Sequence, residues 1–404
     1  MTMTDADARA HRWLHGLWFL TSLGVTIGWM VLRWSGVALH LPWNAVLPGI
    51  VICGSAFLLC WAAELAELEF SQALALAAVA LMTVLPEYAV DLYFAWKAGQ
   101  NPAYTAYAAA NMTGANRLLI GVGWPLLFAI FWWRTRARAL HVGREQSPEL
   151  AALLLATVYS LIIPLKRTLS WLDTIVLLVL FGYYLLQAAR AERSEPELTG
   201  PAKYLAQLSA GPRRAVTAAL FVMAGLAIVL AAEPFAEGLL ELGRHAHIEE
   251  FLLVQWLAPL ASEFPEFLVA ILFVLHRKAG AGFGALVSSK VNQWTLLVGM
   301  LPLAYSLGSH GARAMALDDR QVEEILLTSA QSLFAVAILA DFEFSRGDAW
   351  LLAVPFIMQL SLPFPAVRWG FCGFYLLGFC CLCAQARRRQ ALIGLVRGFF
   401  QPAR

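Results

Sequence analysis

Long apolar runs separated by short polar segments fill most of the chain between residues 13 and 385. A helix needs roughly 20 mainly apolar residues to cross a bilayer, and runs of about this length recur about twelve times. The sequence therefore predicts an all-α polytopic membrane protein with about 12 transmembrane helices. The predicted spans are 13–32, 45–66, 70–97, 103–132, 149–165, 169–190, 214–242, 248–276, 281–305, 322–341, 348–363 and 367–385.

The composition supports the membrane class, because 60% of the residues are hydrophobic, 14% are charged and the mean hydropathy is +0.65. Soluble domains usually carry about 25% charged residues. The first span begins at Trp13 behind a polar leader without a cleavage-site pattern, so we interpret it as a retained helix. The basic residues follow the helix ends, which argues against a nucleic-acid partner. The six cysteines lack metal-ligand spacing, and no cofactor is expected.

Lysine and arginine are distributed unequally between the two sides of the predicted bundle. With twelve spans, about nineteen lie on one side and about eight on the other. Cytoplasmic loops carry the excess of positive charge. We therefore expect an integral protein of the plasma (inner) membrane with both termini in the cytoplasm. The lipid bilayer and inorganic cations are its expected partners, and the sequence does not indicate an oligomeric state.

A polar linker at 191–213 separates two halves that share an order of motifs. Each half has a Pro-Glu pair inside an apolar segment, followed by a segment with amides, hydroxyls and glycines in its first part. Five spans per half is an odd number, so the second half should enter the membrane from the opposite side. Inverted repeats of this kind are typical of secondary transporters. The predicted domains are a leader with an extra helix (1–44), the first repeat (45–190), the linker, the second repeat (214–363), and an extra helix with a basic tail (364–404).

Four carboxylates lie inside these spans: Glu87, Asp91, Glu263 and Glu266. Charge within a bilayer costs several kcal/mol, so an intramembrane acid is a functional candidate. Each Pro-Glu proline, Pro86 or Pro265, removes an amide donor, and we expect it to interrupt its helix. The carbonyl groups released in this way can line a cavity and coordinate a cation. A simple proline kink in a packed helix is the structural alternative.

Specific motifs surround these acids in both halves. The first half contains MTVLPE at 82–87 and NMTGAN at 111–116, and the second contains ASEFPE at 261–266 and, more weakly, ALVSSK at 285–290. These segments resemble the GTSxPE-like and GNxxGSN-like motifs of the sodium/calcium exchanger superfamily, also called cation/calcium antiporters. The resemblance covers most of 45–363. By position it implies that the transported cations bind Glu87, Glu266, Thr83, Ser262, Asn111, Asn116 and Ser288.

The departures from the family pattern concern charge. Lys290 stands where the first half has Asn116, and Arg117 follows that asparagine. Glu263 replaces a hydroxyl, and Asp91 adds a carboxylate one turn after the first glutamate. We expect Lys290 to pair with one of the nearby glutamates and, together with Arg117, to influence selectivity or proton coupling. A structural role for Lys290 and a helix-end role for Arg117 remain open.

These features predict a secondary active antiporter, not an enzyme. Na⁺ or H⁺ would exchange against Ca²⁺ or Na⁺ by alternating access, at a midplane site in which Glu87 and Glu266 bind the metal ion, since hard cations prefer oxygen ligands. No HExxH motif or metal-spaced histidine cluster is present. A cation channel and a non-transporting sensor derived from an exchanger are the alternatives. Further acids recur at helix ends, as vestibule groups or, as we favour, a solvated interface: Glu64, Glu67, Glu233 and Glu237.

Overall fold

The structure is a computed structural model that describes residues 5–68, 84–189, 198–362 and 364–401. Within these ranges, nine helices are long and apolar enough to cross a membrane. The predicted all-α membrane class is confirmed, whereas the number of twelve spans stays a prediction. The nine helical stretches are Trp13–Ser35, Trp43–Glu67, Pro102–Thr135, Arg144–Lys166, Trp171–Ala188, Ala210–Ala246, Glu250–Leu275, Asp319–Leu339 and Pro365–Ala384.

The chain divides into two compact units. The smaller comprises Met1–Val90, Glu192–Glu250 and Ala261–Pro265, and we call it the small unit. The larger comprises Asp91–Ala191, Phe251–Leu260 and Glu266–Arg404, and we call it the large unit.

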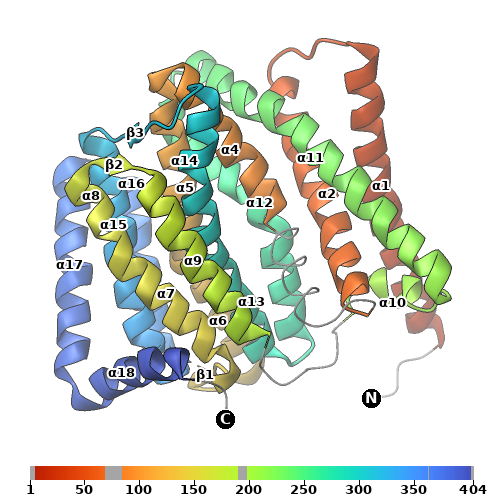
Figure 1. Cartoon of the computed structure of the whole chain (residues 1–404). Helices are drawn as coiled ribbons and strands as arrows, with labels where there is room; N and C mark the ends of the chain where they lie inside the picture. The colour runs from red at the N-terminus through yellow and green to blue at the C-terminus, as the bar shows by residue number, and fades with distance from the viewer. Residues whose placement is uncertain (1–4, 69–83, 190–197, 363, 402–404) are drawn as a thin grey trace. The chain divides into compact units, whose positions relative to one another are not determined.

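The small unit is built mainly from three long helices that lie side by side, α1, α2 and α11 (Figure 1). A hydrogen bond of 2.9 Å joins the buried hydroxyls of Thr26 and Ser55. The last helix begins at Ala210, inside the predicted linker, because the segment after Ser209 continues as a helix that includes two arginines, which are good helix formers. The helices are α1 (Asp5–Ser35), α2 (Trp43–Glu67), α10 (Ala202–Leu205) and α11 (Ala210–Ala246).

The large unit contains most of the remaining helices. Two helices begin or continue across the division between the units: α4 (Leu85–Gln100) and α12 (Glu250–Leu275). The elements of the first half are η1 (Pro102–Tyr104), α5 (Thr105–Leu118), η2 (Leu119–Gly123), α6 (Trp124–Thr135), β1 (Ala139–His141), η3 (Arg144–Gln146), α7 (Ser147–Ser160), α8 (Ile162–Lys166), β2 (Thr168–Leu169) and α9 (Trp171–Ala188). Those of the second half are α13 (Ala279–Asn292), η4 (Gln293–Leu297), α14 (Val298–Gly308), β3 (Met315–Ala316), α15 (Asp319–Leu339), β4 (Glu343–Ser345), α16 (Arg346–Ser361), α17 (Pro365–Ala384) and α18 (Ala386–Phe400).

Two short antiparallel ladders, which the hydropathy pattern did not predict, join loops from different halves of the chain. In one ladder β1 pairs with β4, with Leu140 opposite Phe344. In the other β2 pairs with β3, with Leu169 opposite Met315. The sequence separation between β1 and β3 is nearly the same as that between β2 and β4, so these strands occupy equivalent places in the two halves. The two ladders therefore join equivalent loops, and they lie at opposite ends of the large unit (Figure 1).

The third long helix of each half contains a single π-helical turn. These turns are η2 in the first half and η4 in the second, and each directly follows the helix that carries the amide and hydroxyl motif. A π turn inserts one residue into the α-helical hydrogen-bond pattern and occurs often at functional sites. The helices just before these turns, α5 and α13, carry the glycines Gly114, Gly282 and Gly284.

The Pro-Glu segments differ in their local structure. Pro86 lies in the first turn of α4, where a missing amide donor costs little. Residues 69–83 are outside the described part, so an interruption there stays a prediction. Around Pro265, α12 is helical from Glu250 to Leu275, and the interruption predicted at this proline does not occur. A proline removes one hydrogen bond without ending a helix when neighbouring turns are well packed.

The polar end of the chain was predicted as a basic tail, but it forms the helix α18. Its apolar residues Leu392, Leu395 and Phe399 are buried, whereas most of its arginines are exposed. Apolar positions spaced three to four residues apart make one apolar face, which packs against α7. Because the hydropathy of this segment is low, a search for apolar membrane spans does not identify it as a helix.

Candidate functional site

Lys290 and Asn116 meet in the core of the large unit. The ammonium of Lys290 donates a hydrogen bond of 2.6 Å to the Asn116 side-chain oxygen, and both residues are 0% exposed. The same ammonium lies 4.6 Å from the centre of the Trp294 ring. The sequence separation of Lys290 from Asn116 equals that between the first residues of the two π turns. The two positions that the motifs made equivalent are therefore in direct contact.

Asn111 and Asp91 form a second polar pair in the same unit. Both are buried, and the carboxamide of Asn111 is the polar group beside the Asp91 carboxylate. Both carboxylate oxygens of Asp91 lack a geometrically acceptable hydrogen bond from any described residue. Buried polar oxygens are normally satisfied, so this pair is a candidate for binding an ion.

Glu266 accepts a hydrogen bond from the hydroxyl of Ser289. The family resemblance implied Ser288 as a cation ligand, and in the structure the Ser288 hydroxyl lies 2.9 Å from the hydroxyl of Tyr184. Neighbouring residues on a helix point about 100° apart, so two adjacent serines cannot face the same partner. The contact between Ser289 and Glu266 was not predicted from the sequence, because the weak ALVSSK match left the register between these serines open. The role of Ser288 as a cation ligand stays a prediction.

The remaining predicted ligands lie in the small unit. Glu87, Ser262 and Glu263 are each buried there, with exposures of 2%, 4% and 0%. Burial of two carboxylates in apolar helices is costly unless they are paired or functional. Thr83 lies outside the described residues. The single site that would join these residues to Glu266 stays a prediction.

Arg117 forms a buried ion pair that the sequence did not indicate. Its guanidinium lies 2.5 Å from Glu324 on α15, with side-chain exposures of 3% and 4%. Gln255 donates a 3.0 Å hydrogen bond to the same carboxylate, and the Trp256 ring lies 5.1 Å from the guanidinium carbon. Arg117 lies in the last turn of α5, but its charge does not reach solvent there, and Glu324 balances it.

A second ion pair extends this network to the C-terminal helix α17. Arg368 donates a 2.8 Å hydrogen bond to Glu323 and lies 3.9 Å from Glu324. Glu323 and Glu324 fall inside the predicted span 322–341, so the sequence could have identified them as intramembrane acids and functional candidates. Their partners could not be identified, because Arg117 and Arg368 are far from them in sequence.

Gly114 of the NMTGAN motif has a packing role. A Cβ atom at this position would lie 1.8 Å from the main-chain oxygen of Gln255. Only glycine permits such an approach of two backbones. The motif glycine thereby holds α5, with Asn111 and Asn116, directly against the first part of α12.

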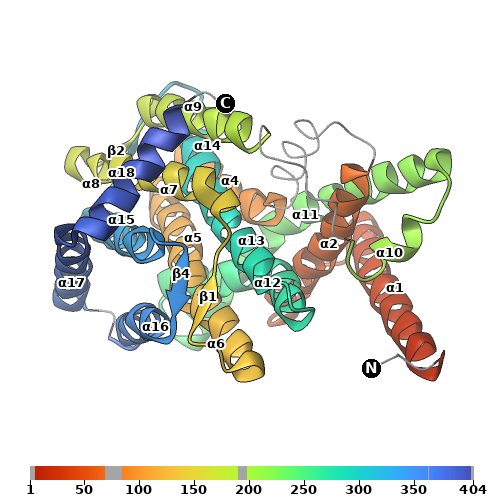
Figure 2. The same ribbon diagram turned by 90° about the horizontal axis from the view of Figure 1, so that it is seen from below.

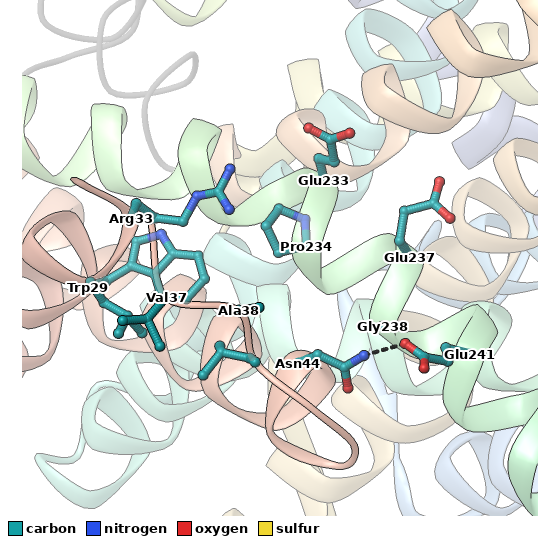
Figure 3. A pocket seen from close by; sticks show the side chains of 12 residues that line it. Trp29, Arg33, Val37, Ala38, Asn44, Glu233, Pro234, Glu237, Gly238 and Glu241 are labelled. Carbon is teal, nitrogen blue, oxygen red and sulfur yellow. Dashed lines mark hydrogen bonds between the residues drawn. The ribbon is translucent and has the colours of Figure 1, made fainter. Parts of the chain in front are cut away.

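Two of the acids recurring at helix ends line a cavity of about 390 Å³ in the small unit (Figure 3). Glu233, Glu237 and Glu241 follow one another at four-residue spacing on α11, and Arg33 lies on the same cavity. Asn44 donates a hydrogen bond to Glu241. The choice between a vestibule and a solvated interface stays open. Within the described residues, no three His, Cys, Asp or Glu side chains are arranged to hold a metal ion.

Comparison with known proteins places these features in a family. The family model for the sodium/calcium exchanger protein matches residues 39–189 and 216–364. The chain is similar to the crystal structure of the H⁺/Ca²⁺ exchanger CAX, with 41% identity, a TM-score of 0.92, and coverage of 95% of this chain and 97% of that one.

More distant structures share the fold alone. The sodium-calcium exchanger NCX_Mj soaked with 10 mM Na⁺ and 10 mM Sr²⁺ has 19% identity and a TM-score of 0.53, covering 78% of this chain and 96% of that one. Comparison with curated proteins gives no significant match. The family model matches most of the chain, in two separate segments. The chain belongs to the sodium/calcium exchanger protein family.

Proposed function

We propose that this family member exchanges H⁺ against Ca²⁺ across the membrane by alternating access. One observation carries the choice of ions: the 41% identity, over 95% of the chain, to the H⁺/Ca²⁺ exchanger CAX. The buried acids supply the hard oxygen ligands that Ca²⁺ prefers, and carboxylates also carry protons. Membership of the family makes cation antiport the general activity, and the ion pair is the proposal.

In this mechanism Lys290 acts as a tethered cation. Its ammonium binds the Asn116 oxygen, an atom that a Ca²⁺ ion would use as a ligand. Two unit charges 4 Å apart repel by about 4 kcal/mol at an effective dielectric constant of about 20, and a divalent ion doubles this energy. Ca²⁺ and the charged lysine therefore do not occupy this position together. Either the ammonium moves away or it releases its proton when Ca²⁺ arrives.

The arrangement of the two halves supports alternating access. Equivalent ladders lie at opposite ends of the large unit, and equivalent π turns occur in the third helix of each half (Figure 1). Such pairs are expected when the second half is inverted with respect to the first. The predicted domain limits, the cytoplasmic termini and the midplane site belong to the same proposal.

Ion flux in proteoliposomes tests the function. An acidic interior should drive Ca²⁺ uptake, because protons leaving the vesicle exchange for entering Ca²⁺, and a Na⁺ gradient without a pH gradient should drive none. Uptake driven by Na⁺ alone would instead make the chain a Na⁺/Ca²⁺ exchanger. Currents that need no counter-ion would indicate a channel.

One contact favours a second function, a non-transporting sensor. If Lys290 never leaves Asn116, the chain would bind no cation there and show no gradient-driven uptake. Full-length protein that gives no flux under any of these gradients, while Lys290→Asn restores uptake, would establish that alternative.

A further inference from the structure

The amphipathic helix α18 crosses one end of the large unit. In Figure 1 it runs roughly perpendicular to α7 and α17, at the end where β1 lies, and Figure 2 shows it from below. Its polar residues and short length exclude it from the candidate spans of the described chain. A helix with a basic polar face and one apolar face is typical of the membrane interface.

Contacts at both ends hold α18 in this position. Near its start, Arg388 forms a 2.7 Å ion pair with Asp341 and donates to carbonyls at the end of α15. Near its end, the main-chain oxygen of Phe399 accepts hydrogen bonds from Tyr183 (3.1 Å) and Gln187 (2.9 Å). The helix is therefore a fixed part of the fold and not a loose tail.

A cavity of about 400 Å³ lies between α18, the start of α7 and the turn after α15. Its wall is mainly apolar, and the α18 side consists of Leu395 and three small residues, Ala391, Gly394 and Gly398. Arg144 and Arg387, both exposed, lie on the same cavity. The carboxylate that also lines it, Asp341, is paired with Arg388, so among the described lining residues Arg144 and Arg387 give the cavity a positive charge.

Gly394 and Gly398 indicate that the described part of the chain does not pack into this space. Each glycine inside a helix costs about 1 kcal/mol relative to alanine. Yet no heavy atom of the described chain lies within 4 Å of a Cβ built at Gly394 or Gly398. The glycines are not needed for close contact with another helix, and their effect is to widen the cavity.

We propose that this cavity binds an anionic phospholipid, with its phosphate on Arg144 and Arg387 and an acyl chain along the glycine side of α18. Arginine forms paired hydrogen bonds to phosphate oxygens. The mainly apolar wall suits hydrocarbon, and basic pockets at the ends of membrane helices bind anionic headgroups. Free phosphate would bind only the arginines and would make no favourable contact with the apolar wall.

The test is binding of phosphatidylglycerol to the purified, delipidated full-length protein, measured by native mass spectrometry against phosphatidylcholine. The wild-type protein should prefer phosphatidylglycerol. Arg144→Gln and Arg387→Gln should each weaken that preference about fivefold, the factor expected for one positive charge near an anionic lipid surface. Gly394→Leu, with Gly398→Leu as a second variant, should reduce binding with both arginines intact.

Arg397→Gln is the matched control, because Arg397 is an exposed arginine of α18 that does not line the cavity. If Arg397→Gln weakened the preference for phosphatidylglycerol as much as the cavity variants do, the lipid would be attracted to basic residues in general. This result would overturn the proposed site. Equal binding of phosphatidylglycerol and phosphatidylcholine would also overturn it. Displacement by inorganic phosphate alone, or unchanged binding in both glycine variants, would exclude a lipid as the occupant.

Discussion

At the scale of single residues, the contact between Lys290 and Asn116 is the central feature of the proposed mechanism. The second half supplies a cation where the first supplies an amide oxygen, and the two side chains bind each other. In the proposed mechanism, Lys290 must either move away from Asn116 or release its proton in each transport cycle. Lys290 is therefore expected to link Ca²⁺ binding to proton movement.

Lys290→Asn should raise the apparent affinity for Ca²⁺ by at least about tenfold, equivalent to about 1.4 kcal/mol. The substitution removes a positive charge from the Asn116 oxygen and adds a second amide ligand. Ca²⁺-dependent uptake should also respond less to external pH. Both quantities are measured in proteoliposomes over a range of Ca²⁺ concentrations and pH values.

Lys278→Asn is the control, since Lys278 is an exposed lysine just before α13. It should leave affinity and pH response unchanged. If Lys290→Asn behaved in the same way, Lys290 would have only a structural role.

The Arg117–Glu324 pair should be essential for stability, because both charges are buried. Removing one partner leaves the other charge unpaired, at a cost of about 3–5 kcal/mol. Arg117→Gln and Glu324→Gln should each lower the unfolding midpoint in detergent strongly, and the double variant should lose less than the two single losses combined. Additive losses would mean that the two charges are not coupled.

At the scale of elements, the crossing of α5 and α12 depends on Gly114. Gly114→Ala would place a methyl group 1.8 Å from the Gln255 oxygen, so one helix must move. We expect a loss of about 3 kcal/mol or more in stability, above the usual cost of overpacking because the obstacle is backbone. Thermal unfolding in detergent measures this loss.

Gly182→Ala in α9 provides the comparison. No heavy atom of the described chain lies within 4 Å of its Cβ position, so alanine should be neutral or slightly stabilising there. Equal stability of both variants would contradict the close crossing of α5 and α12.

The apolar helices were predictable from sequence because lipid requires long, continuous apolar runs. Other elements depend on interactions that the hydropathy pattern does not contain. The π turns and the two ladders arise from contacts between distant segments, and α18 is too polar to be recognised as a span. For the candidate site, the motifs predicted Asn116 and Glu266 as ligands, but which of Ser288 and Ser289 faces Glu266 depends on the rotation of α13.

At the scale of the whole molecule, two observations of different kind agree. The family model matches the chain twice, over residues 39–189 and 216–364. In addition, the described residues of each segment contain one π turn, η2 in the first and η4 in the second. Two family matches and one π turn in each matched segment are consistent with the proposed inverted repeat.

The exchange itself is tested most directly by measuring protons and Ca²⁺ together. Acid-loaded proteoliposomes should release protons when Ca²⁺ is added outside, in step with Ca²⁺ uptake. Glu266→Gln should abolish both movements, and Glu343→Gln, a change at a half-exposed carboxylate of the β4 ladder, should leave both intact. Ca²⁺ uptake without proton release, or full exchange by Glu266→Gln, would contradict the proposed H⁺/Ca²⁺ antiport.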